Sequence, residues 1–150
     1  MEPNNFKEVV TFAIRKEAEA YNLYTTYSQL VKNPGTKAMF EELAKEEQRH
    51  REILVGVDKK DVSEYKLEKI PDIKISDFID EQEFSPDTDY ASALRLAIKR
   101  EEFSLRLYNL MAERAEGPEL KKLFSVLAQE EAKHKLRLEG EYDENVLMWN

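Results

Sequence analysis

A Glu-x-x-His pair occurs twice in this chain, and the two copies lie in segments that align without a gap. Glu47 and His50 lie in the segment FEELAKEEQRH, and Glu131 and His134 lie in FSVLAQEEAKH, 84 positions later. The sequence has no other histidine. A Glu and a His three residues apart share one face of a helix, so both can bind one metal ion. Two aligned copies therefore predict a metal site built from a repeated helical unit.

The repeat extends beyond these pairs and has the periodicity of helices. Apolar residues recur at alternating steps of three and four, a heptad pattern, in four stretches: 6–31, 40–57, 90–115 and 120–138. Asn33-Pro34-Gly35 and Gly117-Pro118 interrupt the pattern where turns are expected. The sequence therefore predicts an all-α fold, a four-helix bundle made of two repeated antiparallel helix hairpins.

The 150 residues fit a single domain. Hairpin 1 is predicted at about 4–57, with the second helix ending at Gly56, and hairpin 2 at about 87–140, capped by Asp87 or Thr88. Segment 58–86, which includes a predicted short helix at 76–83, is long for a compact domain. We interpret it as a crossover that returns the chain along the bundle. Residues 141–150 are expected to form a tail that packs on the bundle or on a second subunit.

Glutamates interrupt the apolar helix faces at one level of the predicted bundle. Glu17 is the only charged member of the first heptad pattern, and Glu101 has the same place in the third. At a rise of about 1.5 Å per residue, Glu17 lies roughly 24 Å from the first turn, and Glu47 and His50 lie roughly 21 and 26 Å back along the next helix. The second half repeats this spacing. One mid-bundle layer is therefore expected to contain Glu17, Glu47, His50, Glu101, Glu131 and His134.

Four carboxylates inside an apolar core require partners of opposite charge. Burying an unpaired carboxylate costs several kcal/mol, and neighbouring carboxylates repel one another. Two divalent cations would balance the charge, and oxygen-rich ligation with one imidazole per metal suits iron or manganese. Zinc favours fewer ligands richer in nitrogen or sulfur, and calcium rarely binds imidazole. Because the chain has no cysteine, we exclude disulfides, thiolate metal sites and cysteine-ligated iron–sulfur centres.

The net charge of −8 argues against binding to nucleic acid and to anionic membrane surfaces. The N-terminus has no signal-peptide pattern, and no apolar run approaches the length of a membrane span. We therefore expect a cytoplasmic protein.

Both hairpins resemble the ferritin-like dimetal (diiron) carboxylate proteins of the rubrerythrin-related kind. The shared motif is a Glu with a Tyr seven residues later, followed by Glu-x-x-His, all of it repeated. The resemblance implies two bridging ligands, Glu47 and Glu131. It also implies that one metal is completed by Glu17 with His50 and the other by Glu101 with His134. Tyr24 and Tyr108 match tyrosines that hydrogen-bond to ligand carboxylates in these proteins. The alternative is that both tyrosines only pack in the apolar core.

Several features depart from the related families. Rubrerythrins proper carry a further Glu three residues after the third-helix ligand, where this chain has Ser104. They also carry a cysteine-rich rubredoxin-like domain that passes electrons, whereas this chain has no cysteine. A separate electron donor would then be needed. Bacterioferritins have a haem-ligating Met directly after the second-helix Glu, where this chain has Gln48, so no haem is expected. The tail is short for the fifth helix that helps ferritins close a storage cage.

These observations favour an oxidoreductase whose diiron centre reacts with hydrogen peroxide or dioxygen. The alternatives are an iron-binding or ferroxidase protein for iron sequestration, a dimanganese protein that disproportionates peroxide, and a structural bundle whose polar groups satisfy one another. A homodimer is expected. Glu46 and Glu130 precede the bridging residues and are either solvated or interhelical charges, or hydrogen-bond partners of the histidines.

Overall fold

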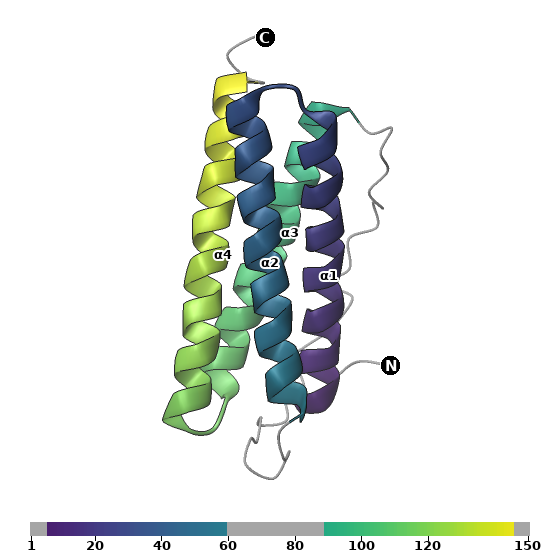
Figure 1. The fold of residues 1–150 in the computed structure, drawn as a ribbon. Coiled ribbons are helices and arrows are strands. Elements are labelled where there is room, and N and C mark those ends of the chain that lie inside the picture. Colours follow the sequence, from purple (N-terminus) through teal and green to yellow (C-terminus); the bar gives the residue numbers. More distant parts are fainter. Residues whose placement is uncertain (1–5, 60–88, 146–150) are drawn as a thin grey trace.

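The computed structural model describes residues 6–59 and 89–145, and these residues form four long helices (Figure 1). They are α1 (Phe6–Leu30), α2 (Pro34–Lys59), α3 (Tyr90–Arg114) and α4 (Pro118–Asn145). The described ranges contain no strand. The four-helix bundle predicted from the heptad pattern is thus confirmed. None of these helices combines the length and apolar character needed to cross a membrane.

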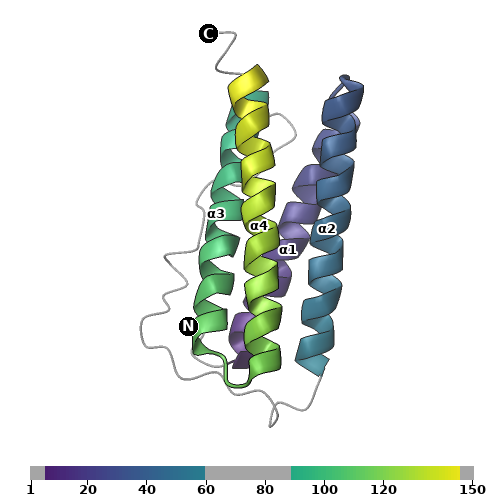
Figure 2. The same cartoon turned by 90° about the vertical axis from the view of Figure 1, so that its left-hand side faces the viewer.

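Each helix packs mainly on its partner within a hairpin. α1 pairs along its length with α2, and α3 pairs with α4, whereas α1 meets α3 and α2 meets α4 at far fewer positions (Figure 2). α2 and α3 run in the same direction, so the end of α2 and the start of α3 lie at opposite ends of the bundle (Figure 1). A crossover is the connection that this placement requires. The predicted crossover itself and its short helix lie outside the described residues.

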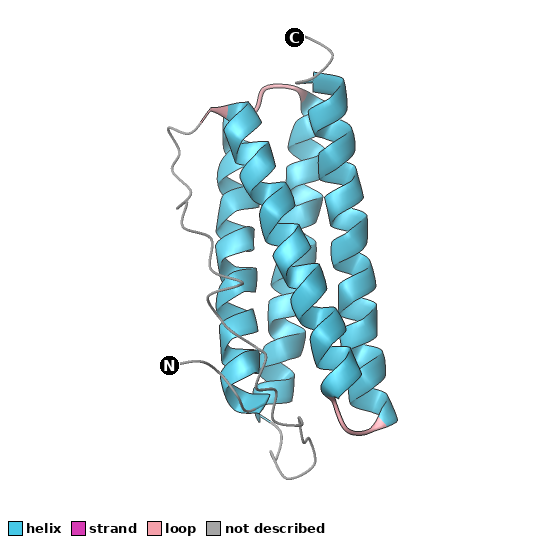
Figure 3. Cartoon of the chain, turned by 180° about the vertical axis from the view of Figure 1, so that it is seen from behind, coloured by secondary structure: helices cyan, strands magenta, loops and turns pink. Residues whose placement is uncertain are grey.

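Both hairpin turns follow from local sequence, and they lie at opposite ends of the bundle (Figure 3). At the first turn the Asn33 side chain accepts hydrogen bonds from the backbone N–H groups of Gly35 and Thr36, at 2.9 and 3.1 Å, and so caps α2. At the second turn Gly117 has a φ of 97°, a conformation that favours glycine. A proline follows at the first helical position in both cases, where its missing N–H costs nothing.

Asp89 caps α3, so the prediction of Asp87 or Thr88 as the cap was wrong. The Asp89 side chain accepts hydrogen bonds from the backbone N–H and the hydroxyl of Ser92, at 2.9 and 2.8 Å. Asp87, Thr88 and Asp89 are three neighbouring residues whose side chains can cap a helix. The sequence alone did not show which of them directly precedes the first helical turn.

Two helices also continue beyond their predicted ends. α2 passes through Gly56 to Lys59, and α4 passes through Gly140 to Asn145. A glycine inside a helix costs only about 1 kcal/mol relative to alanine. Apolar contacts on the far side of each glycine offset that cost, because Val57 is buried and Tyr142 packs against the core. The predicted tail is therefore helical as far as Asn145, and its last five residues lie outside the described part.

The apolar core is divided into two clusters along the bundle axis. One lies toward the α3–α4 turn and includes Val10, Leu54 and Phe124. The other lies toward the α1–α2 turn and includes Leu43 and Leu94. Fully burying one such side chain contributes about 1.5–3 kcal/mol. A layer of polar residues separates the two clusters at mid-height.

Candidate metal centre

All six residues singled out by the spacing lie in this buried layer. Each is at most 2% exposed to solvent. α1 contributes Glu17 and α3 contributes Glu101. α2 contributes Glu47 and His50, and α4 contributes Glu131 and His134.

The six side chains form two overlapping groups. One consists of Glu17, Glu47, His50 and Glu131, and the other of Glu47, Glu101, Glu131 and His134. Within each group the potential ligand atoms lie within 4.8 Å of one another. Glu47 and Glu131 belong to both groups. This is the geometry that two neighbouring cations with two shared carboxylates would need.

Distances around the two imidazoles match closely. His50 Nδ1 lies 2.7 Å from a Glu131 oxygen and 3.8 Å from a Glu17 oxygen. His134 Nδ1 lies 2.7 Å from a Glu47 oxygen and 3.7 Å from a Glu101 oxygen. The same contact is therefore made twice, between positions related by the 84-residue offset. The rings themselves stack, with centroids 5.8 Å apart.

The polar groups of the layer do not satisfy one another. Each of the six residues has at least one buried oxygen or nitrogen without a hydrogen-bond partner, including both carboxylate oxygens of Glu131 and Nδ1 of both histidines. A buried polar atom without a partner typically costs about 1–3 kcal/mol, and more if it is charged. This is unfavourable for the structural-bundle alternative. Converging lone pairs of oxygen and imidazole nitrogen fit metal ions of the iron or manganese type.

Glu46 and Glu130 form hydrogen bonds with the imidazole nitrogens that face away from the polar layer. His50 Nε2 hydrogen-bonds to Glu130, and His134 Nε2 hydrogen-bonds to Glu46, so each carboxylate comes from the opposite hairpin. An ionised carboxylate can only accept, which leaves the proton on Nε2 and the Nδ1 lone pair facing the layer. The sequence left two alternatives open, and the structure shows the hydrogen bond to histidine at both positions. Glu130 is also an interhelical charge, because it forms an ion pair with Arg49 on α2. The repeated acidic position was the only signal for the hydrogen bonds to histidine.

Two buried tyrosines orient the remaining carboxylates. The Tyr24 hydroxyl donates to Glu101, and the Tyr108 hydroxyl donates to Glu17, again across the hairpins. Burial raises the pKa of both phenols well above the usual value, and the nearby carboxylates raise it further. Both tyrosines therefore remain protonated hydrogen-bond donors at neutral pH.

In the metal-free protein the surroundings disfavour the ionised form of three of the four carboxylates. Burial, followed by repulsion from the other glutamates, raises the pKa of Glu17 and Glu131 well above the usual value and that of Glu47 to about 8. Burial also opposes ionisation of Glu101, but the nearby Glu131 and His134 and the hydrogen bond from Tyr24 outweigh burial and lower the pKa of Glu101. A bound cation would favour the ionised form of all four.

Comparison with known proteins agrees with this geometry. The rubrerythrin family profile matches residues 8–142. A hypothetical protein from Pyrococcus furiosus is 24% identical, with 96% of this chain and 91% of that chain covered and a TM-score of 0.75. A protein assigned as a ferritin-like diiron-carboxylate protein, from Thermotoga maritima, is 24% identical, with coverages of 96% and 99% and a TM-score of 0.78.

At this identity the two solved structures show the fold alone, a ferritin-like four-helix bundle. No curated protein matches the chain significantly. The family match extends over both hairpins, and the buried Glu/His cluster within it indicates a dimetal site. The chain belongs to the rubrerythrin family.

Proposed function

We propose that this protein is a diiron-carboxylate oxidoreductase that reacts with hydrogen peroxide or dioxygen. The observation that carries the proposal is the pair of overlapping groups of buried ligand atoms that share Glu47 and Glu131 and lack hydrogen-bond partners. Two divalent cations would balance the four carboxylates. Such a pair of metals, when bound, can hold both oxygens of an oxidant and supply one electron each.

The proposed ligands divide into shared and terminal groups. Glu47 and Glu131 would bridge the two metals. Glu17 with His50 would complete one metal, and Glu101 with His134 the other. We propose iron as the native metal, since a carboxylate-rich set with one imidazole per metal suits it, and manganese as the alternative.

The surrounding side chains maintain the site. Tyr24 and Tyr108 hold the terminal carboxylates by O–H donation, and Glu46 and Glu130 keep each imidazole turned with Nδ1 inward. The apolar clusters above and below exclude water and thereby strengthen the electrostatic interactions within the layer. Because the chain has no cysteine, we propose that reducing electrons come from a separate protein or small-molecule donor.

Anaerobic loading with ferrous iron tests this function directly. We expect about two iron ions per chain, and about one hydrogen peroxide consumed for every two ferrous ions oxidised, since peroxide takes two electrons and two protons to give two waters. Elemental analysis and ferrous-specific colorimetry measure both quantities. Bound iron that stays ferrous with peroxide and with dioxygen would disprove the proposal. Two bound manganese ions with steady oxygen release would instead favour peroxide disproportionation.

The same preparation separates this function from iron sequestration. An oxidoreductase should saturate at about two iron ions per chain, which is the capacity of one dimetal layer. Size-exclusion chromatography with light scattering gives the size of the assembly. A large shell whose iron uptake continues far beyond the two sites would contradict the proposed function and support storage.

The hydrogen bonds from Glu46 and Glu130 should support metal affinity. We expect Glu46→Gln and Glu130→Gln each to weaken ferrous binding by about 10–100-fold, the usual effect of removing an outer hydrogen bond from a ligating histidine. Competition with a chromophoric chelator measures the affinity. Glu41→Gln on α2 and Glu119→Gln on α4 are the matched controls for Glu46→Gln and Glu130→Gln, because each removes one exposed carboxylate from the same helix. Unchanged affinity in both Glu46→Gln and Glu130→Gln would show that these carboxylates do not position the histidines.

A further inference from the structure

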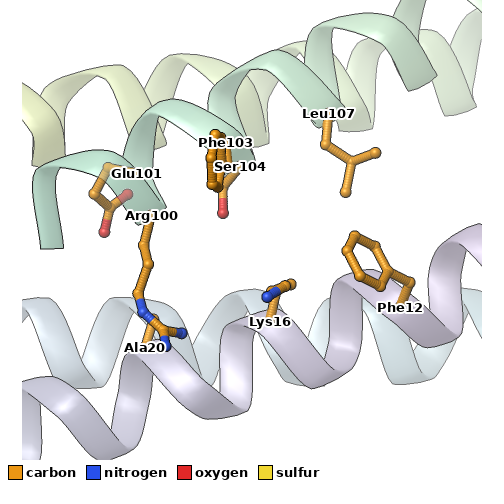
Figure 4. A pocket seen from close by; sticks show the side chains of 8 residues that line it. All are labelled: Phe12, Lys16, Ala20, Arg100, Glu101, Phe103, Ser104 and Leu107. Atoms are coloured by element: carbon orange, nitrogen blue, oxygen red, sulfur yellow. The ribbon is translucent and has the colours of Figure 1, made fainter. Parts of the chain in front are cut away.

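A groove between α1 and α3 reaches the polar layer at Glu101 (Figure 4). Its inner space has a volume of about 20 Å³, enough for a molecule of roughly one or two oxygen atoms. Its lining includes Lys16 from α1, and Ser104 and Arg100 from α3. In Figure 4 the Ser104 hydroxyl and the Glu101 carboxylate both point from α3 toward α1. The groove therefore leads from the protein surface to the side chain of Glu101, which is 1% exposed.

Small residues keep this groove from closing. Ala20 and Ser104 each lie three residues, or about one helical turn, after Glu17 and Glu101 respectively. Both residues line the groove. Of its large apolar side chains, Phe12 and Leu107 lie further along it, and Phe103 lies beside Ser104 (Figure 4). A leucine or longer side chain at position 104 would extend into the space beside the Glu101 carboxylate.

Ion pairs form the wall that joins the two helices beside the groove. Glu19 lies 2.8 Å from Arg100 on α3 and 3.3 Å from Lys16 on its own helix. The Arg100 Nε is buried and has no hydrogen-bond partner. These contacts join α1 and α3 beside the groove. Lys16 on α1 and Ser104 on α3 both line it (Figure 4).

On the opposite side of the described bundle, a cavity reaches a histidine of the layer. A cavity between α2 and α4 is lined by His134 together with Glu46 and Glu130. There the two carboxylates hydrogen-bond to the outward Nε2 atoms of the histidines. The imidazoles therefore stand between that cavity and the carboxylate layer. Of these two openings, the α1–α3 groove is the one that reaches a carboxylate of the layer directly.

We propose that the α1–α3 groove is the entrance through which a peroxide-sized oxidant reaches the metal centre, with Ser104 and Lys16 setting the size limit. The inference rests on the proposed function and specifies its substrate class. Hydrogen peroxide, with two oxygen atoms and no substituent, can pass. Organic hydroperoxides with aromatic or branched substituents are excluded by the narrow space between the helices.

Thiol labelling tests the groove without metal or activity. The chain has no cysteine, so Ser104→Cys introduces a single thiol of nearly the same size as the serine it replaces. We expect this thiol to react with the small reagent methyl methanethiosulfonate but not with the bulky reagent fluorescein maleimide. Asn109→Cys, at an exposed position of the same helix, should react with both reagents. In the double variant Lys16→Ala with Ser104→Cys, the thiol should also react with the maleimide. A thiol at position 104 that is inert to both reagents, or equally reactive with both, would overturn the proposal.

Rates with iron-loaded protein test the consequence for the oxidant. Ser104→Leu should bind the same amount of iron but slow its oxidation by hydrogen peroxide by about tenfold or more, an added barrier of at least about 1.36 kcal/mol. Asn109→Leu is the matched control for added apolar bulk outside the groove. Lys16→Ala should raise the rate with cumene hydroperoxide relative to that with hydrogen peroxide. Equal rates in Ser104→Leu and Asn109→Leu would overturn the proposal. If peroxide oxidises none of the proteins, the proposed function fails, and the labelling result still decides whether the groove is open.

Discussion

A variant carrying both Glu47→Ala and Glu131→Ala is expected to bind almost no metal, whereas the unchanged protein binds about two ions per chain. Both glutamates belong to both groups of ligand atoms. Their removal leaves each metal with a single carboxylate and a single imidazole, and removes half of the negative charge that the cations would balance. Elemental analysis after anaerobic ferrous loading and desalting measures the loss. Reaction with peroxide should disappear with the metal.

The matched control for this variant is Glu41→Ala with Glu119→Ala. It removes the same charge from the same two helices at exposed positions, so its metal content should equal that of the unchanged protein. Circular dichroism checks that both variants remain helical. Metal retained at about two ions per chain after loss of Glu47 and Glu131 would place the binding site elsewhere and refute the assignment of the layer.

The sequence predicted the level of the site because helix geometry is regular. Counting about 1.5 Å per residue from the two turns was enough to place Glu17, Glu47 and His50 at one height, and the structure brings all three into one buried layer. An acidic residue in an otherwise apolar heptad position was the decisive signal. The four-helix bundle followed from the same pattern, since the period of the apolar residues fixes which face of each helix is buried.

The sequence did not predict which side chains meet across the hairpins. Tyr24 donates to Glu101 rather than to the glutamate of its own helix, and His50 meets Glu130 rather than its neighbour Glu46. These pairings depend on the rotation and separation of helices that are not joined by a short turn. The groove beside Ser104 has the same origin, because its width is set by how closely α1 approaches α3. Local spacing within one helix contains none of this information.

Removing the metal is expected to make the stability of the protein fall as the pH rises from about 5 to 8. In the metal-free protein, burial and neighbouring carboxylates raise the pKa of Glu17, Glu47 and Glu131 above the usual value of 4.5. Above pH 4.5 the unfolded chain has released these protons while the folded protein retains them. Folding is therefore opposed increasingly until the pH reaches the pKa of the folded state.

The expected size of this effect is large. For Glu47 alone, a pKa raised from 4.5 to about 8 corresponds to on the order of 5 kcal/mol of stability lost across this interval. His134 acts in the same direction above pH 6.5. Burial opposes its protonation, but Glu101 and Glu46 outweigh this and raise its pKa, so its contribution fades as the pH rises. Glu101, whose pKa is lowered, affects stability only below about pH 4.5.

Bound metal should reverse this dependence, because coordination requires the ionised carboxylates and the neutral imidazoles, and binding strengthens as protons are released. Urea denaturation of metal-free and iron-loaded protein at pH 5.5 and pH 8 measures both trends, with the iron kept ferrous under anaerobic conditions. The metal-free protein should be more stable at pH 5.5, and the stabilisation by iron should be greater at pH 8. In the metal-free protein, Glu47→Gln should flatten the pH dependence, since the amide stays neutral throughout. A metal-free protein whose stability does not fall between pH 5.5 and 8 would show that Glu17, Glu47 and Glu131 are ionised without a cation. The physical reason for placing two metals in this layer would then be lost.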